Sequence, residues 1–443
     1  MNNLVNKING LVVGAVLFSA TFVSAQVNTS EFFVDGLKVI HKTSIKETVS
    51  VRLFVKGGST NYSMEKQGIE NLAFKLAMEG GTVSKNKQVF AGASEKIGAS
   101  FTGTSGADFG ILSMTCLKMY WDQSWDLFSD AVMNPAMGNS EFELVKNQLV
   151  NDAQQATGDP DSHVGRMAMK NAFQGTSYEK DPAGTPESLQ ALKLGEVSEY
   201  YKQLIGKKNC FLVVVGNITK EDLTNKISKS LAKLGEGKVP TIEINKGVGA
   251  ATVAIENRDI ETNYIIGVMD APKKGTDEAV ANSIAMSIMG DRFFTELRTK
   301  RSLSYAPAAF AAGDITHPNN GVYISTTNPK ESIKVMTEEL SKVKKVGFTE
   351  QELAGTKQGF LTNYYMGQET NERQSLALGR NEIASSWKDA DLFTQRVNNT
   401  DLKTINNVMK KYIETIKWSY LGKESMVKPE DFLQPVGNTV IKN

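Results

Sequence analysis

A repeat with a long period constrains this chain more than any other feature of its sequence. The segment Ser140-Glu141-Phe142-Glu143-Leu144 recurs in modified form 209 residues later as Thr349-Glu350-Gln351-Glu352-Leu353, and each copy opens a long helical pattern. The pairs Tyr200-Tyr201 and Lys411-Tyr412 precede short apolar runs at a nearly matching offset. We therefore expect two α+β halves of about 200 residues each, with chance similarity of two helical patterns as the alternative.

The spacing of apolar residues predicts alternating strands and helices. Alternation over residues 49–55 predicts a strand with one face turned to a core. From Gly68 to Glu79 apolar residues recur at i, i+3, i+4, i+7 and i+8, which is the stripe of an amphipathic helix. Further strands are expected at 37–40, 109–119, 210–215 and 418–421, and helices at 123–133, 141–156, 195–205 and from about Thr219.

The first 25 residues have the pattern of a secretory signal peptide. Lys7 precedes the apolar run Leu11–Phe18, and Val23-Ser24-Ala25 forms a small-residue cleavage site. We expect export to the periplasm or cell envelope and, after signal removal, no membrane span, because the run is shorter than a spanning helix. An uncleaved anchor is the alternative.

A stretch rich in Gly and containing Pro separates the two expected halves. We predict a signal peptide at 1–25, a first domain at 26–235, a linker at 236–250 and a second domain at 251–443. The 50 Lys and Arg side chains balance 49 Asp and Glu side chains, leaving a net charge of +1. This balance gives no electrostatic footprint for nucleic acid, so no nucleic-acid partner is expected.

Metal-ligating and thiol side chains are scarce. The three histidines, His41, His163 and His317, show no ligand spacing, and we expect ordinary surface or loop histidines. Cys116 and Cys210 lie in apolar, strand-like runs, where a buried free thiol is the default and a disulfide is possible in an oxidising compartment. The composition therefore offers few soft ligands for a transition metal.

Two groups of residues resemble signatures of the pitrilysin-like (insulinase-type) zinc metallopeptidases. Gly68–Lys75, followed by Glu79-Gly80-Gly81, lies where that family carries a helix with the inverted zinc motif H-x-x-E-H. Leu297–Tyr305 resembles the family's C-terminal Arg/Tyr signature. The resemblance implies two homologous α/β-sandwich halves, each a mixed sheet with helices packed on it, that form a clam-like chain.

The aligned zinc-motif positions carry the wrong chemistry for a metallopeptidase. Asn71 and Lys75 stand where the family has two His ligands, Phe74 stands where it has the general base, and Asp152 is what remains near the third ligand. A lysine ammonium repels Zn²⁺, and a phenyl ring accepts no proton. We therefore expect no zinc and no cofactor in this chain, and no peptidase activity from the chain alone.

Arg298 and Tyr305 keep the spacing of seven residues found in the family signature. The resemblance implies that they reach a substrate bound at a zinc site and help to polarise the scissile carbonyl, a role for which preorganised donors are suited. The alternative is structural: Arg298 caps or pairs at a helix end, and Tyr305 begins a strand over 305–308.

Two functional hypotheses follow from this pattern. In the first, the chain is the non-metal subunit of an exported heterodimeric peptidase, and Arg298 and Tyr305 complete the site of a zinc-bearing, pitrilysin-like paralogue that hydrolyses peptide substrates. In the second, it is a pseudo-peptidase that binds extended peptides or scaffolds an envelope complex. Edge strands such as 101–105 would then capture peptides by β-augmentation.

Overall fold

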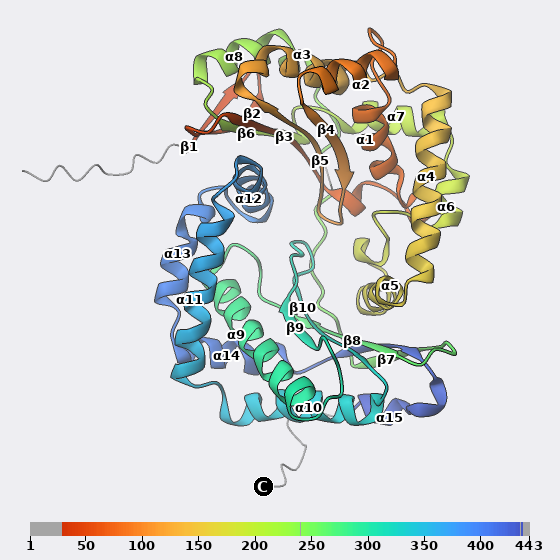
Figure 1. Ribbon diagram of the computed structural model, residues 1–443, viewed down its shortest axis with the longest axis vertical. Coiled ribbons are helices and arrows are strands. Elements are labelled where there is room, and N and C mark those ends of the chain that lie inside the picture. The colour runs from red at the N-terminus through yellow and green to blue at the C-terminus, as the bar shows by residue number, and fades with distance from the viewer. Residues whose placement is uncertain (1–28, 240, 435, 437–443) are drawn as a thin grey trace, which may run out of the picture.

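The computed structural model describes residues 29–239, 241–434 and 436, so the predicted signal peptide lies outside the described residues. The chain forms two mixed β-sheets, each with helices packed on it, and the two halves face one another (Figure 1). The six-stranded sheet has the order β1-β2-β6-β3-β5-β4, and the five-stranded sheet has the order β7-β11-β8-β10-β9. The expected α+β architecture of two sheet-and-helix halves is confirmed.

The first half contains the strands of the six-stranded sheet and eight α-helices within the described ranges. Its strands are β1 (Thr29–Val34), β2 (Leu37–Thr43), β3 (Thr48–Lys56), β4 (Ser100–Ser105), β5 (Phe109–Leu117) and β6 (Cys210–Gly216). Its helices are α1 (Ile69–Glu79), α2 (Lys87–Lys96), α3 (Trp121–Met133), α4 (Asn139–Gly158), α5 (Pro160–Ala172), α6 (Pro186–Ala191), α7 (Leu194–Leu204) and α8 (Lys220–Lys229).

The second half repeats this plan. Its strands are β7 (Thr252–Asn257), β8 (Asn263–Asp270), β9 (Ala308–Ala311), β10 (Asn319–Thr326) and β11 (Lys417–Gly422). Its helices are α9 (Asp277–Phe293), α10 (Pro329–Val346), α11 (Glu350–Gly367), α12 (Asn371–Ala384), α13 (Asp389–Asn399), α14 (Leu402–Tyr412) and α15 (Pro429–Phe432). Residues 294–299 form a π-helical turn at the end of α9.

The sequence repeat corresponds to matching pairs of elements. The copies at residues 140–144 and 349–353 lie at the starts of α4 and α11, and the later strands β6 and β11 each insert in parallel beside an earlier strand, β2 and β7. In α11 the Thr349 hydroxyl accepts a hydrogen bond from the Glu352 amide, which is one half of a capping box. Strand β1 is an addition at the edge of the first sheet.

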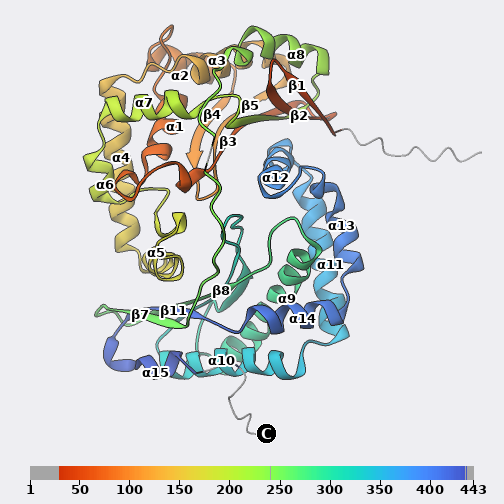
Figure 2. The same cartoon turned by 180° about the vertical axis from the view of Figure 1, so that it is seen from behind.

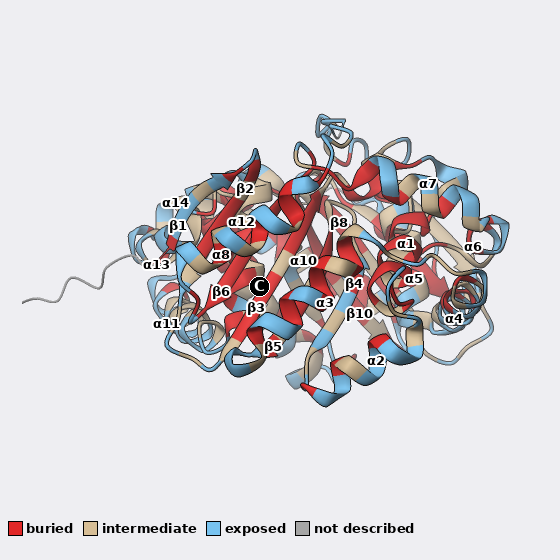
Figure 3. Cartoon of the chain, turned by 90° about the horizontal axis from the view of Figure 1, so that it is seen from above, coloured by how far each residue is buried: buried red, intermediate tan, exposed pale blue. Residues whose placement is uncertain are grey.

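Each half has its own core between one sheet face and its helices. Alternate residues of β3, beginning with Val49 and Val51, join the first core with the apolar stripe of α1, as the sequence pattern predicts. Trp418 of β11 belongs to the corresponding core of the second half, against helices α9, α10 and α14. Figure 3 shows that buried residues dominate the strands β3 and β6, whereas α2 carries many exposed residues.

The two halves exchange helices across their facing sheets. Helix α12 of the second half covers β3 and β6 of the first sheet, where Leu378 packs with Phe54 and Phe211. Helix α5 of the first half covers β8 and β11 of the second sheet, where Ala168 packs in a cluster with Val268. Figures 1 and 2 show both helices lying against the opposite half. Because each half buries an element of the other, the halves form an interlocked pair.

The chain passes between the halves without regular structure. Residues 234–239 and 241–251 contain neither helix nor strand, and Figure 2 shows this segment running from the first half to the second. Within the described part of the chain, no helix combines the length and apolar content that a membrane crossing needs. Cys116 of β5 and Cys210 of β6 are both buried and free, so the possible disulfide between them is absent.

Candidate functional site

Helix α1 carries three of the four predicted zinc-motif positions. It begins after Gly68, whose positive φ of 84° admits the tight entry into the helix. The Phe74 ring is fully buried and meets the Tyr201 ring edge-on at a centroid distance of 6.2 Å. The Lys75 ammonium lies on the partly exposed side and is 3.7 Å from the Glu79 carboxylate. The residue predicted to stand at the general-base position is therefore part of the core.

The fourth position, Asp152, is exposed on α4, the long helix that packs against α1. The structure thus brings the two helices of the predicted zinc site together, as the resemblance implies. Across residues 29–239, 241–434 and 436, no three His, Cys, Asp or Glu side chains come close enough to hold a metal ion. A lone carboxylate beside an amide and an ammonium is a poor donor set for Zn²⁺.

A buried carboxylate that sequence reasoning missed lies next to these positions. Glu70 is fully buried and accepts hydrogen bonds from the Tyr200 hydroxyl at 2.6 Å, the Ser105 hydroxyl at 2.8 Å and the Asn61 amide at 3.0 Å. Burial raises the pKa of Glu70 to about 7, although these three hydrogen bonds favour the ionised form. No sequence signal marks this cluster, because its partners come from three separate elements.

Arg298 and Tyr305 form one stacked unit at the end of α9. The guanidinium of Arg298 lies 4.2 Å from the centroid of the Tyr305 ring and 4.8 Å from that of Phe294. Its Nη1 donates a hydrogen bond of 2.9 Å to the backbone carbonyl of Tyr305. The Tyr305 side chain is 79% exposed, and Phe294 is 45% exposed. Two aromatic rings therefore hold the guanidinium at the protein surface.

The local backbone explains how this unit arises. Residues 294–299 adopt a π-helical turn, a conformation that often marks a functional position, and this turn brings Arg298 beside Phe294. Tyr305 lies in the segment before β9, which begins at Ala308, so the alternative in which Tyr305 begins a strand is wrong. The other alternative is that Arg298 caps or pairs at a helix end. Arg298 does pair at the end of α9, but its partner is the backbone carbonyl of Tyr305.

Charges around the unit are distributed unevenly. Lys300 and Arg301 both bind the Glu296 carboxylate at 2.6 Å, and these interactions lower the pKa of Glu296 against the effect of burial. Arg298 has no carboxylate within ion-pair distance in the described part of the chain. Its charge is therefore the one on this turn that remains available to an external acceptor.

The structure does not join the two predicted sites within one chain. The contacts of Arg298 and Tyr305 are made with each other and with Phe294, all in the second half. The degenerate zinc positions lie on α1 and α4 of the first half. The two predicted sites therefore lie in different halves of the chain.

The histidines correct a prediction. His41 is buried in strand β2, so the expectation of a surface or loop side chain is wrong for this residue. His317 lies in the loop before β10, as that expectation allows, but its side chain is also buried. His317 lies 3.1 Å from the Asn245 side chain and 3.2 Å from the Glu243 carboxylate of the connecting segment. His163 is the more accessible of the three and lies 2.8 Å from Glu256. Each burial depends on contacts between segments that are remote in sequence.

Comparison with known proteins places these observations in a family. A family model described as Insulinase (Peptidase family M16) matches residues 38–185. A second model, described as Peptidase M16 inactive domain, matches residues 191–360. The two matches together cover most of the chain, and each includes one of the two predicted sites.

Several relatives show the same likeness over most of their length. An uncharacterized zinc protease from Rickettsia felis is 22% identical over 362 residues, covering 79% of this chain and 86% of the relative. A protein named non-peptidase homolog YmxG, from Helicobacter pylori, is 20% identical over 379 residues, covering 82% and 86%. The mitochondrial-processing peptidase subunit beta of Caenorhabditis elegans is 19% identical over 281 residues, covering 60% of each chain.

A solved structure shares the complete fold. The crystal structure of a peptidase M16 inactive domain from Pseudomonas fluorescens superposes with a TM-score of 0.82 at 17% sequence identity. The match covers 91% of this chain and 100% of the other. The two-sheet architecture is therefore shared with that protein.

Proposed function

The chain belongs to the M16 peptidase family, and we propose that it is the zinc-less subunit of an exported two-chain peptidase. In this assembly a zinc-bearing paralogue supplies the metal and the general base, and this chain supplies Arg298 and Tyr305. One observation carries the proposal: a stacked Arg–Tyr pair is exposed in a chain whose own zinc-motif positions are Asn71, Phe74 and Lys75. The chain alone is expected to be inactive.

The chemistry of the pair suits contact with a peptide carbonyl. A guanidinium whose Nη1 holds the Tyr305 backbone retains its Nε and Nη2 donors, and the exposed phenol adds another. Donors fixed before the reaction stabilise the negative charge that develops on a carbonyl oxygen, with effects of several kcal/mol. Stacking on Phe294 limits the motion of the guanidinium, so little order has to be created when substrate binds.

A partner is supported by the family. The matched relative from Caenorhabditis elegans is by name one subunit of a processing peptidase. Lone donors have no catalytic use without a metal or nucleophile, so their exposure favours a second chain that brings one. Export is supported by the leader pattern at residues 1–25.

The proposal is tested first by affinity purification of the tagged chain from its native envelope fraction. We expect a similar-sized protein bearing H-x-x-E-H to co-purify, with zinc and peptidase activity in the complex and neither in the isolated chain. Recovery of the chain alone, without metal or activity, would contradict the proposal.

The second experiment tests whether Arg298 of the Arg298–Tyr305 pair contributes to catalysis. In the reconstituted complex, Arg298→Ala should lower kcat/KM by about 100-fold without loss of co-purification, because one donor to the developing oxyanion is removed. Lys300→Ala is the matched control, since Lys300 lies on the same turn and is already paired with Glu296. Equal activity of both variants would refute the role of Arg298.

A pseudo-peptidase that binds extended peptides without hydrolysis is the second candidate. It is favoured by β4, which lies at the open end of the strand order in the first sheet. Edge strands accept an added strand through main-chain hydrogen bonds. Peptide binding by the isolated chain that is unaffected by Arg298→Ala would support this candidate over the two-chain peptidase.

A further inference from the structure

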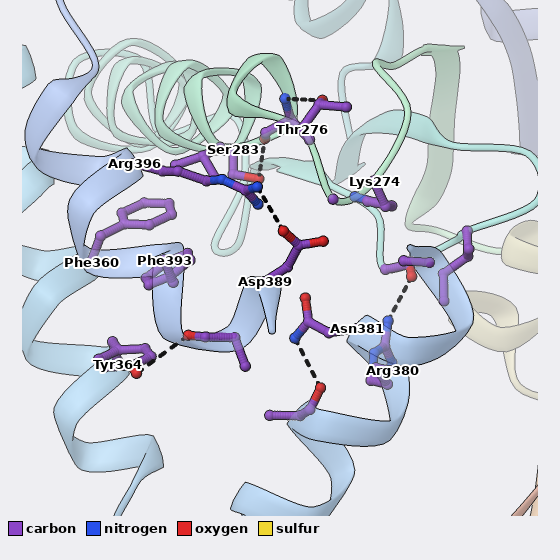
Figure 4. A pocket seen from close by; sticks show the side chains of 18 of the residues that line it. Lys274, Thr276, Ser283, Phe360, Tyr364, Arg380, Asn381, Asp389, Phe393 and Arg396 are labelled. Carbon is purple, nitrogen blue, oxygen red and sulfur yellow. Dashed lines mark hydrogen bonds and ion pairs between the residues drawn. The ribbon is translucent and has the colours of Figure 1, made fainter. Parts of the chain in front are cut away.

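A cavity of about 540 Å³ lies within the second half, away from the Arg–Tyr pair. Its walls come from α9, α11, α12 and α13 and from the segment Gly313–Ile315 (Figure 4). This volume is in the range of small-molecule sites. Neither proposed site uses the cavity, so its lining needs a separate account.

One end of the cavity carries two cations. The Lys274 ammonium donates to the backbone carbonyl of Ala312, and Arg380 Nη2 donates to the carbonyl of Gly313 at 2.6 Å. Each bond occupies one donor, so both groups retain others. Burial lowers the pKa of Lys274, and the carboxylates Asp314 and Asp108 oppose this effect.

The other end is aromatic. Phe360, Tyr364 and Phe393 line it, and the rings of Tyr364 and Phe393 stack at a centroid distance of 5.2 Å. Figure 4 shows these rings on the opposite side of the cavity from Lys274 and Arg380. The cavity therefore has a polar and an apolar end.

The acidic groups nearby are already engaged. Asp389, the one carboxylate among the lining residues, binds Arg396 at 2.7 Å and also accepts a hydrogen bond from Ser385. Asp314 accepts a hydrogen bond from the Asn319 amide at 2.7 Å, and burial raises its pKa. Asp108, which also acts electrostatically on Lys274, accepts hydrogen bonds from the Tyr178 hydroxyl and from the backbone amides of Ile315 and Thr316. Among the residues that line the cavity, Lys274 and Arg380 are the cations at this end, and the carboxylate Asp389 is paired with Arg396.

We propose that this cavity binds a small carboxylic acid with an aromatic or aliphatic tail. The carboxylate lies between Lys274 and Arg380, where charge-assisted hydrogen bonds are available, and the tail lies among Phe360, Tyr364 and Phe393. Two sources share this chemistry: the C-terminal residue of a peptide and a free aliphatic acid.

A second cavity, of about 980 Å³, provides a contrast; it lies beside α5 and is lined by residues of the first half and by Glu256 of β7. Two of its cationic side chains are paired with carboxylates, since Arg166 lies 2.7 Å from Asp181 and His163 lies 2.8 Å from Glu256, and Lys180 donates to the Tyr62 carbonyl at 2.6 Å. Lys170, on its wall, is exposed. Lys170 therefore offers a matched control position, because it is a lysine on the wall of a different cavity.

Titration calorimetry with N-acetyl-phenylalanine tests the proposal directly. We expect saturable one-site binding to the purified chain and at least tenfold weaker binding of N-acetyl-phenylalanine amide, which lacks the charge. Lys274→Gln should weaken binding of the acid about tenfold. Lys170→Gln should leave it unchanged.

A second variant tests whether a loss of ligand binding could result from misfolding. Ala377→Phe fills the cavity without changing a charge and should abolish binding, while circular dichroism confirms the native fold. Tighter binding of N-acetyl-Ala-Ala-Phe than of decanoate would identify a peptide C-terminus, and the reverse order a free aliphatic acid. Equal binding of acid and amide, or unchanged binding in both Lys274→Gln and Ala377→Phe, would overturn the proposal.

Discussion

The two halves share a strand plan but use the helix beside the edge strand in opposite ways. In the first half, α1 packs against the edge strand β4 and buries Phe74. In the second half, α9 packs against the edge strand β9 and ends in a π-helical turn that leaves Arg298 and Tyr305 at the surface. The helix at the same position in the fold therefore buries a ring in one half and ends in an exposed Arg–Tyr pair in the other.

The variant with the largest expected effect introduces a carboxylate at residue 74, the predicted position of the family's general base. Phe74→Glu should destabilise the chain by about 5 kcal/mol or more, because it removes a buried ring and places a carboxylate where no partner awaits it. Chemical denaturation at pH 8 measures the change in free energy of unfolding.

The conservative variant separates the two contributions. Phe74→Leu keeps an apolar side chain and should cost about 1.5 kcal/mol. If Phe74→Glu proved as stable as Phe74→Leu, position 74 would still be able to host a catalytic carboxylate. The contrast between a packed first half and an exposed second half would then fail.

The secondary structure of the first half is largely predictable because its patterns are local. The strand at 49–55 and the helix at 68–79 appear as β3 and α1 with boundaries shifted by one residue. Helix α5 was not predicted, because its small apolar residues, such as Ala168, find their partners on the sheet of the other half. The packing of a helix on the opposite half depends on contacts that are distant in sequence, so the local spacing of apolar residues does not predict it.

In the candidate sites, too, the sequence predicts local features but not those that depend on long-range contacts. The Arg298 to Tyr305 spacing was visible in the sequence, but the stacking with Phe294 depends on a π-helical turn that the pattern did not indicate. The burial of His317 depends on Glu243 and Asn245, which lie more than 70 residues earlier. Burial of polar groups follows from tertiary contacts, so the sequence could place His317 in a loop but could not show that its side chain is buried.

The buried Glu70 gives the next largest effect, and it belongs to the first half alone. The folded state holds its proton more tightly than the unfolded state, since the pKa rises from 4.5 to about 7. Stability should therefore fall as pH rises from 4.5 through 7, by about 3 kcal/mol for this group. Denaturation at a series of pH values should show that Glu70→Gln removes this decline.

An exposed carboxylate provides the control. Glu95 is exposed on α2, and Glu95→Gln should leave the pH dependence of stability as in the unmodified chain. A decline of equal size in Glu70→Gln would show that Glu70 is not its source.

Helices α12 and α5, which each pack on the opposite half, can be compared by how much each stabilises the chain. Leu378 of α12 is 3% exposed on the first sheet, and Leu378→Ala should cost about 3 kcal/mol. Its counterpart on α5 is small, and Ala168→Gly should cost about 1 kcal/mol, chiefly through helix propensity. Thermal unfolding compares the two, and an equal loss would mean that both helices anchor the halves equally.

The variant with the smallest expected effect changes Lys75, which stands at a predicted zinc-ligand position, and tests whether this side chain stabilises the fold. Lys75 is partly exposed, and its 3.7 Å ion pair with Glu79 lies on the surface of α1. Such pairs contribute little, so Lys75→Met should change the free energy of unfolding by no more than about 0.5 kcal/mol. Chemical denaturation decides the point. A loss of more than about 1.5 kcal/mol would mean that Lys75, like Phe74, contributes to the stability of the fold. A neutral result would mean that, of these two positions, only residue 74 has such a structural role.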